Sequence, residues 1–439
     1  MRRRRRDDII MEYGTYMLMF LASYIASLAR LYYVSGILLI VEALYLYVHL
    51  ARESENLVEL RALFTLAWVG GQGLACLRLS RLQGDWSYVT WMCFFLAYIG
   101  FGIGYEWGRQ YRDEEKREIE RDAVLAGRLY LCIVGLFAVS VLCFVFEAVK
   151  VGFIPLFSDK PHAYSYFHVS GVHYFTVSCI LIPAITVLYL KAGGGKGMGK
   201  KAVLVLANLT AAAVPILCVS RFQLLFAAGF AVVTYIMVNK TVRLRTSAAV
   251  VLALLPVYVI LTVFRHHDVA YLNSIFEMKY GKMPIFVTQP YMYVANNFEN
   301  FNCMVEQLTA HTWGIRMLFP VFALTGLKFV FPELTGQALY LTKPELTTLT
   351  MFYDAYYDFG IGGVFLLAVL IGVAAKQCIR LVKRSSNPVS YLFYGQMAIY
   401  LGLAFFTTWF SNPTTWFWLA LTGLMYWFTG YDKKKKRDD

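Results

Sequence analysis

The sequence is a succession of apolar stretches, each about as long as a helix needs to be to cross a lipid bilayer. Such a helix takes about 20 residues, because the hydrocarbon core is about 30 Å thick. We expect spans over residues 9–29, 31–50, 57–78, 86–107, 128–150, 171–190, 202–219, 222–239, 247–264, 356–378, 391–410 and 414–430. The pattern predicts an all-α polytopic integral membrane protein, with about 12 transmembrane helices in a single domain over residues 1–430.

The composition excludes a water-soluble fold. Of the 439 residues, 59% are hydrophobic and only 16% are charged, whereas a soluble domain carries about 25% charged residues. Aromatic residues reach 17%, an excess that suits membrane interfaces. The eight cysteines include no C-x-x-C pair, so neither a zinc site nor thiol redox chemistry is indicated.

The net charge of +13 is concentrated in short breaks between the apolar stretches. Lys and Arg are retained on the cytoplasmic side during insertion, and twelve spans with both termini inside place every basic cluster there. Nucleic-acid binding, the other interpretation of a basic chain, is disfavoured because the clusters lie directly against apolar spans. Residues 431–439 are then a basic cytoplasmic tail. The clusters are Arg2–Arg6, Arg109–Arg128, Lys191–Lys201, Lys240–Arg245, Lys376–Arg384 and Lys433–Arg437.

Two loops are expected on the outer face, over residues 151–170 and residues 265–352. The longer loop contains an apolar stretch, residues 313–331, that is interrupted by Pro320, Gly326 and Lys328. Counting this stretch as a span would move the last basic clusters outside. We therefore expect a re-entrant or surface helix there.

Polar residues gather in these outer loops, and this distribution favours an enzyme over a transporter. A transporter usually keeps its polar residues near the membrane midplane, between repeated halves, and the sequence has no internal repeat. Six of the seven histidines fall in or beside the two loops, namely His162, His168, His173, His266, His267 and His311.

Two arginines are expected at the outer ends of spans. Arg221 lies in CVSRFQLLF and Arg265 in VFRHHDVAY. Each is either an interfacial side chain that snorkels to the headgroups or a ligand of a lipid phosphate. Two guanidiniums at one interface would clamp a pyrophosphate. His266 is a candidate for acid–base chemistry, although an ordinary loop position explains it equally well.

Aromatic and hydrogen-bonding residues in the outer loops suit sugar recognition. Lys160 and His162 are the candidates in the shorter loop, and Tyr291, Tyr293 and Asn297 in the longer one. Interface anchoring explains the same aromatic residues about as well, and an Asn also serves as a helix or turn cap.

A third group of candidates lies in LTMFYDAYYDFGIGGVF, at the outer end of the tenth span. Asp354 and Asp358 are four residues apart and share one helix face. Asp354 is a candidate for the general base of a sugar hydroxyl, as is Glu345 in the preceding loop, and the sequence leaves the identity of the base open. Tyr353 is a candidate for binding the sugar. Asp358, followed by Phe-Gly, is interpreted as a residue that holds a cap or turn.

Missing motifs also discriminate between functions. The chain has no Walker motif, no G-x-G-x-x-G, no H-E-x-x-H and no D-x-D pair, and the first outer turn, Ala29–Leu31, carries no carboxylate. We therefore expect no metal, no nucleotide and no other cofactor.

Four short stretches carry a resemblance to a known family. They are GFIPLFS (152–158) before GVHYF, SRFQLLF (220–226), VFRHH (263–267) and FYDAYYDFGIGGVFLL (352–367). Over about residues 90 to 430 the chain resembles the bacterial oligosaccharide repeat-unit polymerases, the Wzy-type O-antigen or capsule polymerases related to O-antigen ligases. The resemblance implies a GT-C-like glycosyltransferase in the bacterial cytoplasmic (inner) membrane, with its active site facing the periplasm.

The resemblance also implies partners and site residues. The substrate would be a polyprenyl-pyrophosphate-linked oligosaccharide, and the partners a chain-length regulator and a flippase. The two functional arginines of the family would fall on Arg221 and Arg265. Where the ligase relatives carry a His before the YDFGIGG tract, this chain has Thr347–Thr350, which argues against ligase activity.

The sequence thus predicts a metal-independent polymerase of lipid-linked repeat units, with polyprenyl pyrophosphate as the leaving group. A ligase-type glycan transferase, a flippase or exporter of lipid-linked oligosaccharide, and a non-enzymatic assembly partner stay open as alternatives.

Overall fold

The computed structural model of the chain describes residues 6–107, 119, 121–158, 163–239 and 269–430. Across these ranges the chain forms α-helices, a few short 3-10 helices and no β-strand. The β-type pairing found there is a single isolated bridge between Ser80 and Met278. The predicted all-α fold is confirmed for this part of the chain.

The chain divides into two compact units. Unit 1 comprises Met1–Asp113, Asp268–Gln377 and Tyr400–Trp416, and unit 2 comprises Glu114–His267, Cys378–Ile399 and Phe417–Asp439. The sequence predicts a single domain over residues 1–430, whereas the structure contains two compact units.

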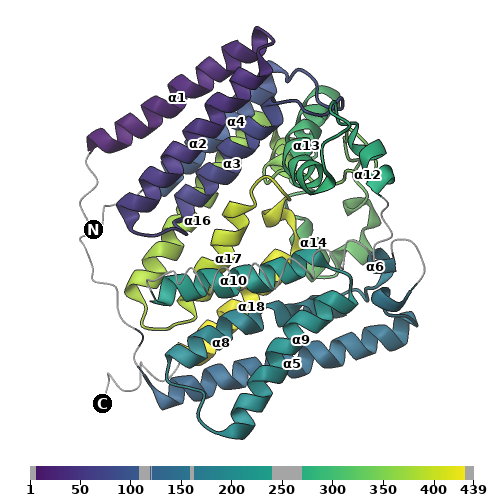
Figure 1. Cartoon of the computed structure of the whole chain (residues 1–439). Helices are drawn as coiled ribbons and strands as arrows, with labels where there is room; N and C mark the ends of the chain where they lie inside the picture. Colours follow the sequence, from purple (N-terminus) through teal and green to yellow (C-terminus); the bar gives the residue numbers. More distant parts are fainter. Residues whose placement is uncertain (1–5, 108–118, 120, 159–162, 240–268, 431–439) are drawn as a thin grey trace. The chain divides into compact units, whose positions relative to one another are not determined.

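Unit 1 is built around four neighbouring helices near the N-terminus (Figure 1). In it, α2 packs along α1 and α3, and α3 also contacts α13. The helices of this unit are α1 (Arg6–Leu28), α2 (Tyr32–Ser54), α3 (Leu60–Cys76), α4 (Tyr88–Glu106), α12 (Val269–Phe276), α13 (Ile285–Gln307), α14 (Phe319–Leu324), α15 (Leu327–Val330), η3 (Pro332–Leu334) and η4 (Trp409–Ser411), together with most of α16 (Tyr353–Arg384).

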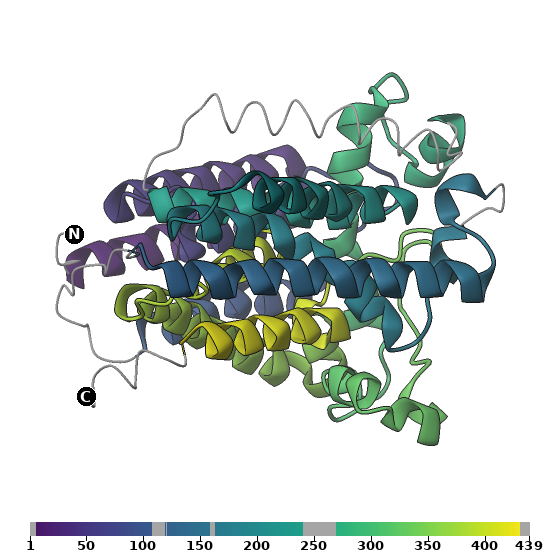
Figure 2. The same ribbon diagram turned by 90° about the horizontal axis from the view of Figure 1, so that it is seen from below.

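Unit 2 contains a long helix, α5, which Figure 2 shows in blue as one uninterrupted rod. In this unit α5 contacts α7 and α8, and α10 contacts α8. Its helices are α5 (Ala123–Val151), η1 (Pro155–Phe157), α6 (Ala163–Tyr166), α7 (Val172–Thr176), η2 (Val177–Leu181), α8 (Ile182–Lys191), α9 (Met198–Leu217) and α10 (Arg221–Asn239), together with most of α17 (Ser390–Gly402) and α18 (Pro413–Gly430).

Eight helical segments within the described ranges are long and apolar enough to cross a membrane. They are Ile9–Leu28, Tyr32–Ser54, Tyr88–Glu106, Ala123–Val151, Val172–Lys191, Met198–Leu217, Arg221–Asn239 and Tyr353–Arg384. Three more expected spans, 57–78, 391–410 and 414–430, overlap the helices α3, α17 and α18. The expected span 247–264 lies outside the described residues. These segments establish a helical membrane protein with several spans, and the count of twelve stays a prediction.

Glycines let the helices of unit 1 approach closely. A Cβ atom on Gly36 of α2 would lie 2.6 Å from the backbone oxygen of Gly73, and a Cβ on Gly73 of α3 would lie 2.8 Å from the oxygen of Gly36. Small residues at facing positions allow this approach, and the resulting van der Waals contact drives helix association inside a membrane. The α2–α3 pair is therefore fixed where only glycine fits on both sides.

Candidate functional site

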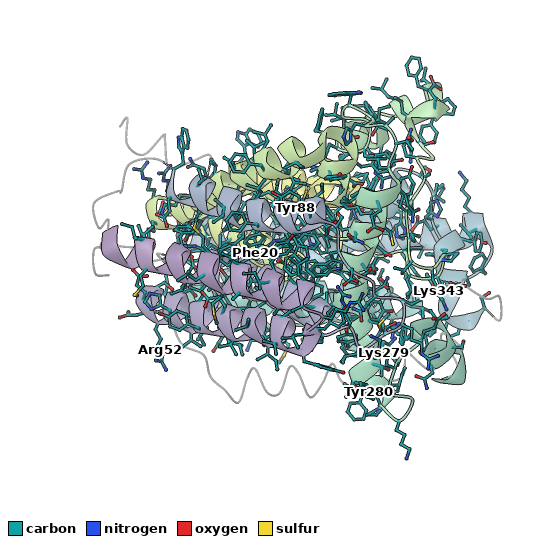
Figure 3. All side chains as sticks on the ribbon, turned by 90° about the horizontal axis from the view of Figure 1, so that it is seen from above. Phe20, Arg52, Tyr88, Lys279, Tyr280 and Lys343 are labelled. Atoms are coloured by element: carbon teal, nitrogen blue, oxygen red, sulfur yellow. The ribbon has the colours of Figure 1, made fainter. Side chains whose placement is uncertain are left out.

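Polar side chains of unit 1 gather at the end where α16 begins. Figure 3 places Lys279, Tyr280 and Lys343 at this end of the unit and Arg52 at the opposite end. The residues between α12 and α16 form this region, which corresponds to the expected large outer loop. We call it the loop end of unit 1.

The central pair at the loop end is Arg316 with Asp354. The Nε of Arg316 donates to Oδ1 of Asp354 over 2.5 Å, and the two side chains are only 13% and 5% exposed. Among the described residues, Nη1 and Nη2 of Arg316 and Oδ2 of Asp354 have no hydrogen-bond partner. The pair thus keeps donors and an acceptor available for a ligand.

Two tyrosine rings hold the guanidinium of Arg316. Its Cζ atom lies 4.6 Å from the ring centroid of Tyr357 and 5.6 Å from that of Tyr353. Such cation–π contacts stabilise an arginine by about 0.5–2 kcal/mol, depending on how far it is desolvated. The guanidinium is therefore oriented before any ligand arrives.

Asp358 positions the segment that carries Arg316. Its carboxylate accepts the backbone N–H of Met317 over 2.7 Å and that of Arg316 over 3.3 Å, and it also accepts the hydroxyl of Thr312. The side chain is fully buried. This geometry agrees with the interpretation of Asp358 as a residue that holds a turn.

A break in α16 separates its first residues, which include Asp354 and Asp358, from the rest of the helix. Gly360 has φ 62° and ψ −148°, values that do not belong to a helix. Residues other than glycine are strongly disfavoured in this region of backbone space. The glycine in the YDFGIGG tract thus allows residues 353–359 to form a short helical segment of their own beside residues 312–317.

The expected sugar-binding residues of α13 are engaged within the protein. Tyr291 donates its hydroxyl to Gln83 over 2.8 Å and accepts the N–H of Leu79 over 3.0 Å. The amide of Asn297 donates to the backbone oxygens of Tyr293 over 2.7 Å and Phe405 over 2.8 Å. Tyr293 itself is half-buried. These contacts join α13 to its neighbouring segments, and a direct role in sugar binding stays a prediction.

Tyr353 is also fully buried. Its hydroxyl accepts the backbone N–H of Tyr340 over 2.9 Å, which ties the loop before α16 to the helix. Its contribution to the site is the ring beside Arg316, and contact with a sugar stays a prediction.

Arg221 is the first residue of α10 and is buried within unit 2. The preceding turn closes α9, because Val219 adopts φ 53° and its N–H donates to Ile216 O over 2.9 Å. Arg221 thus lies at the junction of α9 and α10, and its location at the outer face stays a prediction. It belongs to unit 2, whereas Asp354 belongs to unit 1.

The other candidates, Lys160, His162, Arg265 and His266, lie outside the described residues, and their roles stay predictions.

Glu299 is a buried carboxyl group at the loop end. Its Oε1 accepts the N–H of Gly84 over 2.9 Å, and its Oε2 accepts the indole N–H of Trp86 over 2.9 Å. Burial raises the pKa of Glu299 to about 7, against the lowering effect of these hydrogen bonds. Glu299 therefore connects α13 to the segment before α4 and titrates near neutral pH.

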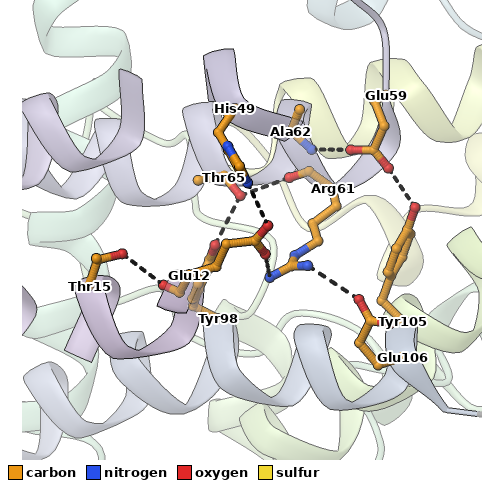
Figure 4. Close-up of polar contacts among 10 residues, drawn as sticks. All are labelled: Glu12, Thr15, His49, Glu59, Arg61, Ala62, Thr65, Tyr98, Tyr105 and Glu106. Atoms are coloured by element: carbon orange, nitrogen blue, oxygen red, sulfur yellow. Dashed lines mark hydrogen bonds and ion pairs between the residues drawn. The ribbon is translucent and has the colours of Figure 1, made fainter. Parts of the chain in front are cut away.

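A second polar cluster lies among α1, α2, α3 and α4 (Figure 4). Arg61 contacts Glu12 over 3.0 Å and Glu106 over 3.3 Å, while His49 contacts the other oxygen of Glu12 over 3.2 Å. Arg61 and Glu12 are each 1% exposed. Polar groups of this kind inside a helix bundle pair with one another because lipid offers them no partner.

This cluster includes a possible ligand set for a cation. Ligand atoms of Glu12, His49 and Glu53 lie within 4.8 Å of one another. Arg61 already neutralises Glu12, so we interpret the cluster as a structural link between helices.

An apolar cavity of about 300 Å³ lies among helices of unit 1. Its walls carry no charged side chain, so it suits an apolar chain and not a sugar. It is lined by Ile40, Ala43, Leu44, Leu63, Leu66, Ala67, Gly70, Gly71, Leu74, Val294, Gly402 and Phe405.

Comparison of the chain with protein-family models, with curated proteins and with solved structures finds no match. The class of protein is therefore defined by the fold and the site alone. The chain is a helical membrane protein with several spans, and in unit 1 an arginine–carboxylate pair lies at the end of one of them.

Sequence reasoning missed Arg316. The available signal was a lone arginine in the apolar stretch TWGIRMLFP, since a charge in such a stretch usually has a partner. The partner, Asp354, lies 38 residues further along the chain, a separation with no local periodicity to reveal it.

Proposed function

We propose that the chain is a membrane glycosyltransferase that polymerises polyprenyl-pyrophosphate-linked oligosaccharide repeat units into a surface polysaccharide. The observation that carries the proposal is the Arg316–Asp354 pair, which leaves Oδ2 and two guanidinium nitrogens available at the start of a span. A lipid-linked substrate presents its saccharide at this depth, next to the membrane surface.

The reaction is a single displacement at an anomeric carbon. A hydroxyl oxygen of one lipid-linked repeat forms the new bond to the anomeric carbon of the chain carried by the other lipid. The bond from that carbon to the pyrophosphate oxygen breaks, and polyprenyl pyrophosphate leaves with the electron pair. The pyrophosphate leaving group supplies the driving force, so the proposed reaction needs neither a nucleotide nor a metal.

The proposal assigns roles to particular residues. Asp354 accepts the hydroxyl proton at Oδ2, while Arg316 holds Oδ1 and fixes the orientation of the carboxylate. Arg221 and Arg265 offset the charge of the leaving pyrophosphate, as cations placed where negative charge develops stabilise a transition state. His266 assists with proton transfer. Binding of the saccharide is assigned to Tyr291, Tyr293, Asn297 and Tyr353 in unit 1, and separately to Lys160 and His162 in unit 2.

The proposed setting is the bacterial cytoplasmic membrane, crossed about twelve times in a GT-C-like arrangement, with both termini inside and the loop end facing the periplasm. The apolar cavity of unit 1 supports a lipid-linked substrate, because it has room for part of a hydrocarbon tail. A chain-length regulator and a flippase are the proposed partners.

The test uses purified protein in detergent with a defined polyprenyl-pyrophosphate oligosaccharide, EDTA and no nucleotide sugar. We expect a ladder of products with regular steps on a gel. Asp354→Asn should slow its formation by about 10²–10⁴-fold, the usual contribution of a general base. Arg221→Ala and Arg265→Ala should also lose the ladder. The matched control is Lys282→Gln, which removes an exposed cation and should leave the ladder unchanged.

Three other outcomes of these measurements would contradict the proposal. Transfer of one glycan to a different acceptor identifies a ligase. Protection of the substrate headgroup in reconstituted vesicles, without any ladder, identifies a flippase or exporter. Inversion at the anomeric centre, measured by NMR of the product, is expected from a single displacement, and retention would exclude it.

A further inference from the structure

We propose that residues 313–331 form a lipid-binding surface that is seated in the leaflet of the membrane where α16 begins. The segment lies along this leaflet without crossing it. This inference does not rest on the proposed function, because it follows from the exposed side chains of unit 1 and from the membrane character of α16.

The segment exposes large apolar side chains along its whole length. It consists of two short helices, α14 and α15, with the turns around them. Contiguous apolar patches of this kind are rare on water-facing surfaces, and they mark contacts with membranes or other proteins. The exposed residues are Trp313, Leu318, Val321, Leu324, Leu327, Phe329, Val330 and Phe331.

The surface adjoins the first residues of α16, a helix that exposes apolar side chains. The backbone N–H of Trp313 donates to Asp358 O over 3.2 Å. The Trp313 ring lies 6.3 Å from the ring of Phe359, and the two side chains are 77% and 46% exposed. Beyond the break at Gly360, Leu366 and Leu370 of α16 are also exposed, and their spacing of four residues places them on one face of the helix. Trp313 and Phe359 therefore expose neighbouring aromatic rings where α16 begins, and the helix exposes further apolar side chains beyond the break.

The charged residues of the segment fit a location in the leaflet. Arg316 is paired with Asp354, and its side chain is only 13% exposed. The Nζ of Lys328 lies 5.0 Å from the ring centroid of Phe329, so its ammonium group lies against an exposed aromatic ring. Aromatic residues and lysines together are typical of the interfacial belt of a membrane protein. The observations thus favour a lipid surface over a second protein.

The test places the photo-crosslinker benzoylphenylalanine at Trp313, Val321 or Phe329 in the full chain, reconstituted in bilayers of phosphatidylcholine and phosphatidylglycerol. After irradiation, mass spectrometry counts lipid adducts on the protein. The matched control carries the crosslinker at Glu345, an exposed position of the same unit outside the segment. All four positions are exposed, so the substitutions leave the core intact. We expect at least about tenfold more lipid adducts at the three segment positions than at Glu345.

Two results would overturn the inference. One is a lipid yield at the segment positions no greater than at Glu345, which would mean that the segment faces water. The other is crosslinking of the segment to a second copy of the chain in place of lipid, which would make this face a protein interface. Neither result depends on formation of a glycan ladder, so the inference and the proposed function fail separately.

Discussion

Trp86 donates its indole N–H to Oε2 of Glu299 over 2.9 Å, and this bond connects the segment before α4 to α13. The other oxygen of Glu299 accepts the N–H of Gly84. Both hydrogen bonds stabilise the ionised carboxylate and so lower the pKa of Glu299. The side chain is only 3% exposed, and the loss of solvation raises the pKa by more than the hydrogen bonds lower it. The result is a pKa of about 7 in place of the ordinary 4.5.

The raised pKa predicts that stability falls as pH rises. The folded protein holds a proton on Glu299 up to about pH 7, whereas the unfolded chain releases it near pH 4.5. Between these values the folded state binds more protons, so the free energy of unfolding decreases with pH, by about 3 kcal/mol in total. Thermal unfolding midpoints of the detergent-solubilised protein, recorded at one scan rate from pH 4.5 to 8, measure this decline.

The matched variant for this prediction is Glu299→Gln, which keeps an acceptor oxygen and cannot ionise. Its unfolding midpoint should decline less over the same pH range than that of the unchanged protein. Parallel curves for the two proteins would show that Glu299 is not the group responsible.

The backbone of Gly360 predicts that alanine substitution destabilises the protein at Gly360 but not at Gly362, although both glycines lie in α16. Its φ of 62° and ψ of −148° are strained for any other residue, and an added Cβ would lie 3.1 Å from Nε2 of His311. We expect Gly360→Ala to destabilise unit 1 by about 1–3 kcal/mol. Gly362→Ala is the control, because a Cβ there meets nothing within 4 Å, and it should be neutral or stabilising by up to about 1 kcal/mol. Equal unfolding midpoints for the two variants would contradict the prediction.

The spans were the most predictable part of the fold. The expected stretch 86–107 corresponds to α4 (Tyr88–Glu106), and 202–219 corresponds to α9 (Met198–Leu217). The agreement has a simple cause, since lipid requires each spanning segment to satisfy its own backbone hydrogen bonds and to be apolar over a fixed length. The end of α16 differs from the expected span 356–378, because the helix continues to Arg384. This last part is basic and lies beyond the apolar stretch.

The pairing of polar residues was far less predictable. Asn297, expected to bind sugar, donates to Phe405 O, a residue more than a hundred positions away in the sequence. The partner of Arg316 is likewise distant along the chain. Hydropathy and residue spacing describe local order, whereas these contacts depend on which helices become neighbours. The sequence alone therefore indicated which residues are polar in an apolar chain but not which of them remain available to a ligand.

The Arg61 cluster gives the sharpest stability prediction, because its two principal members are almost inaccessible. Arg61 contacts Glu12 over 3.0 Å, and each side chain is 1% exposed. Removing one partner of a buried ion pair leaves a charge in an apolar interior, which costs about 3–5 kcal/mol. Arg61→Met keeps most of the side-chain volume, so we expect the loss to arise from the charge. Arg52→Met, at an exposed position of α2, is the matched control and should change stability by less than about 0.5 kcal/mol.

A double variant separates charge from packing. In Arg61→Met with Glu12→Gln, the carboxylate that lost its guanidinium is itself removed, so stability should recover by at least about half of the loss. Glu106, the other partner of Arg61, is 26% exposed and retains access to water. The double variant Arg61→Met with Glu106→Gln should therefore recover less of the lost stability. The measurement is the unfolding midpoint of each variant in the same detergent. If Glu106→Gln restored more than Glu12→Gln, the buried Glu12–Arg61 contact would not be the main link between α1 and α3.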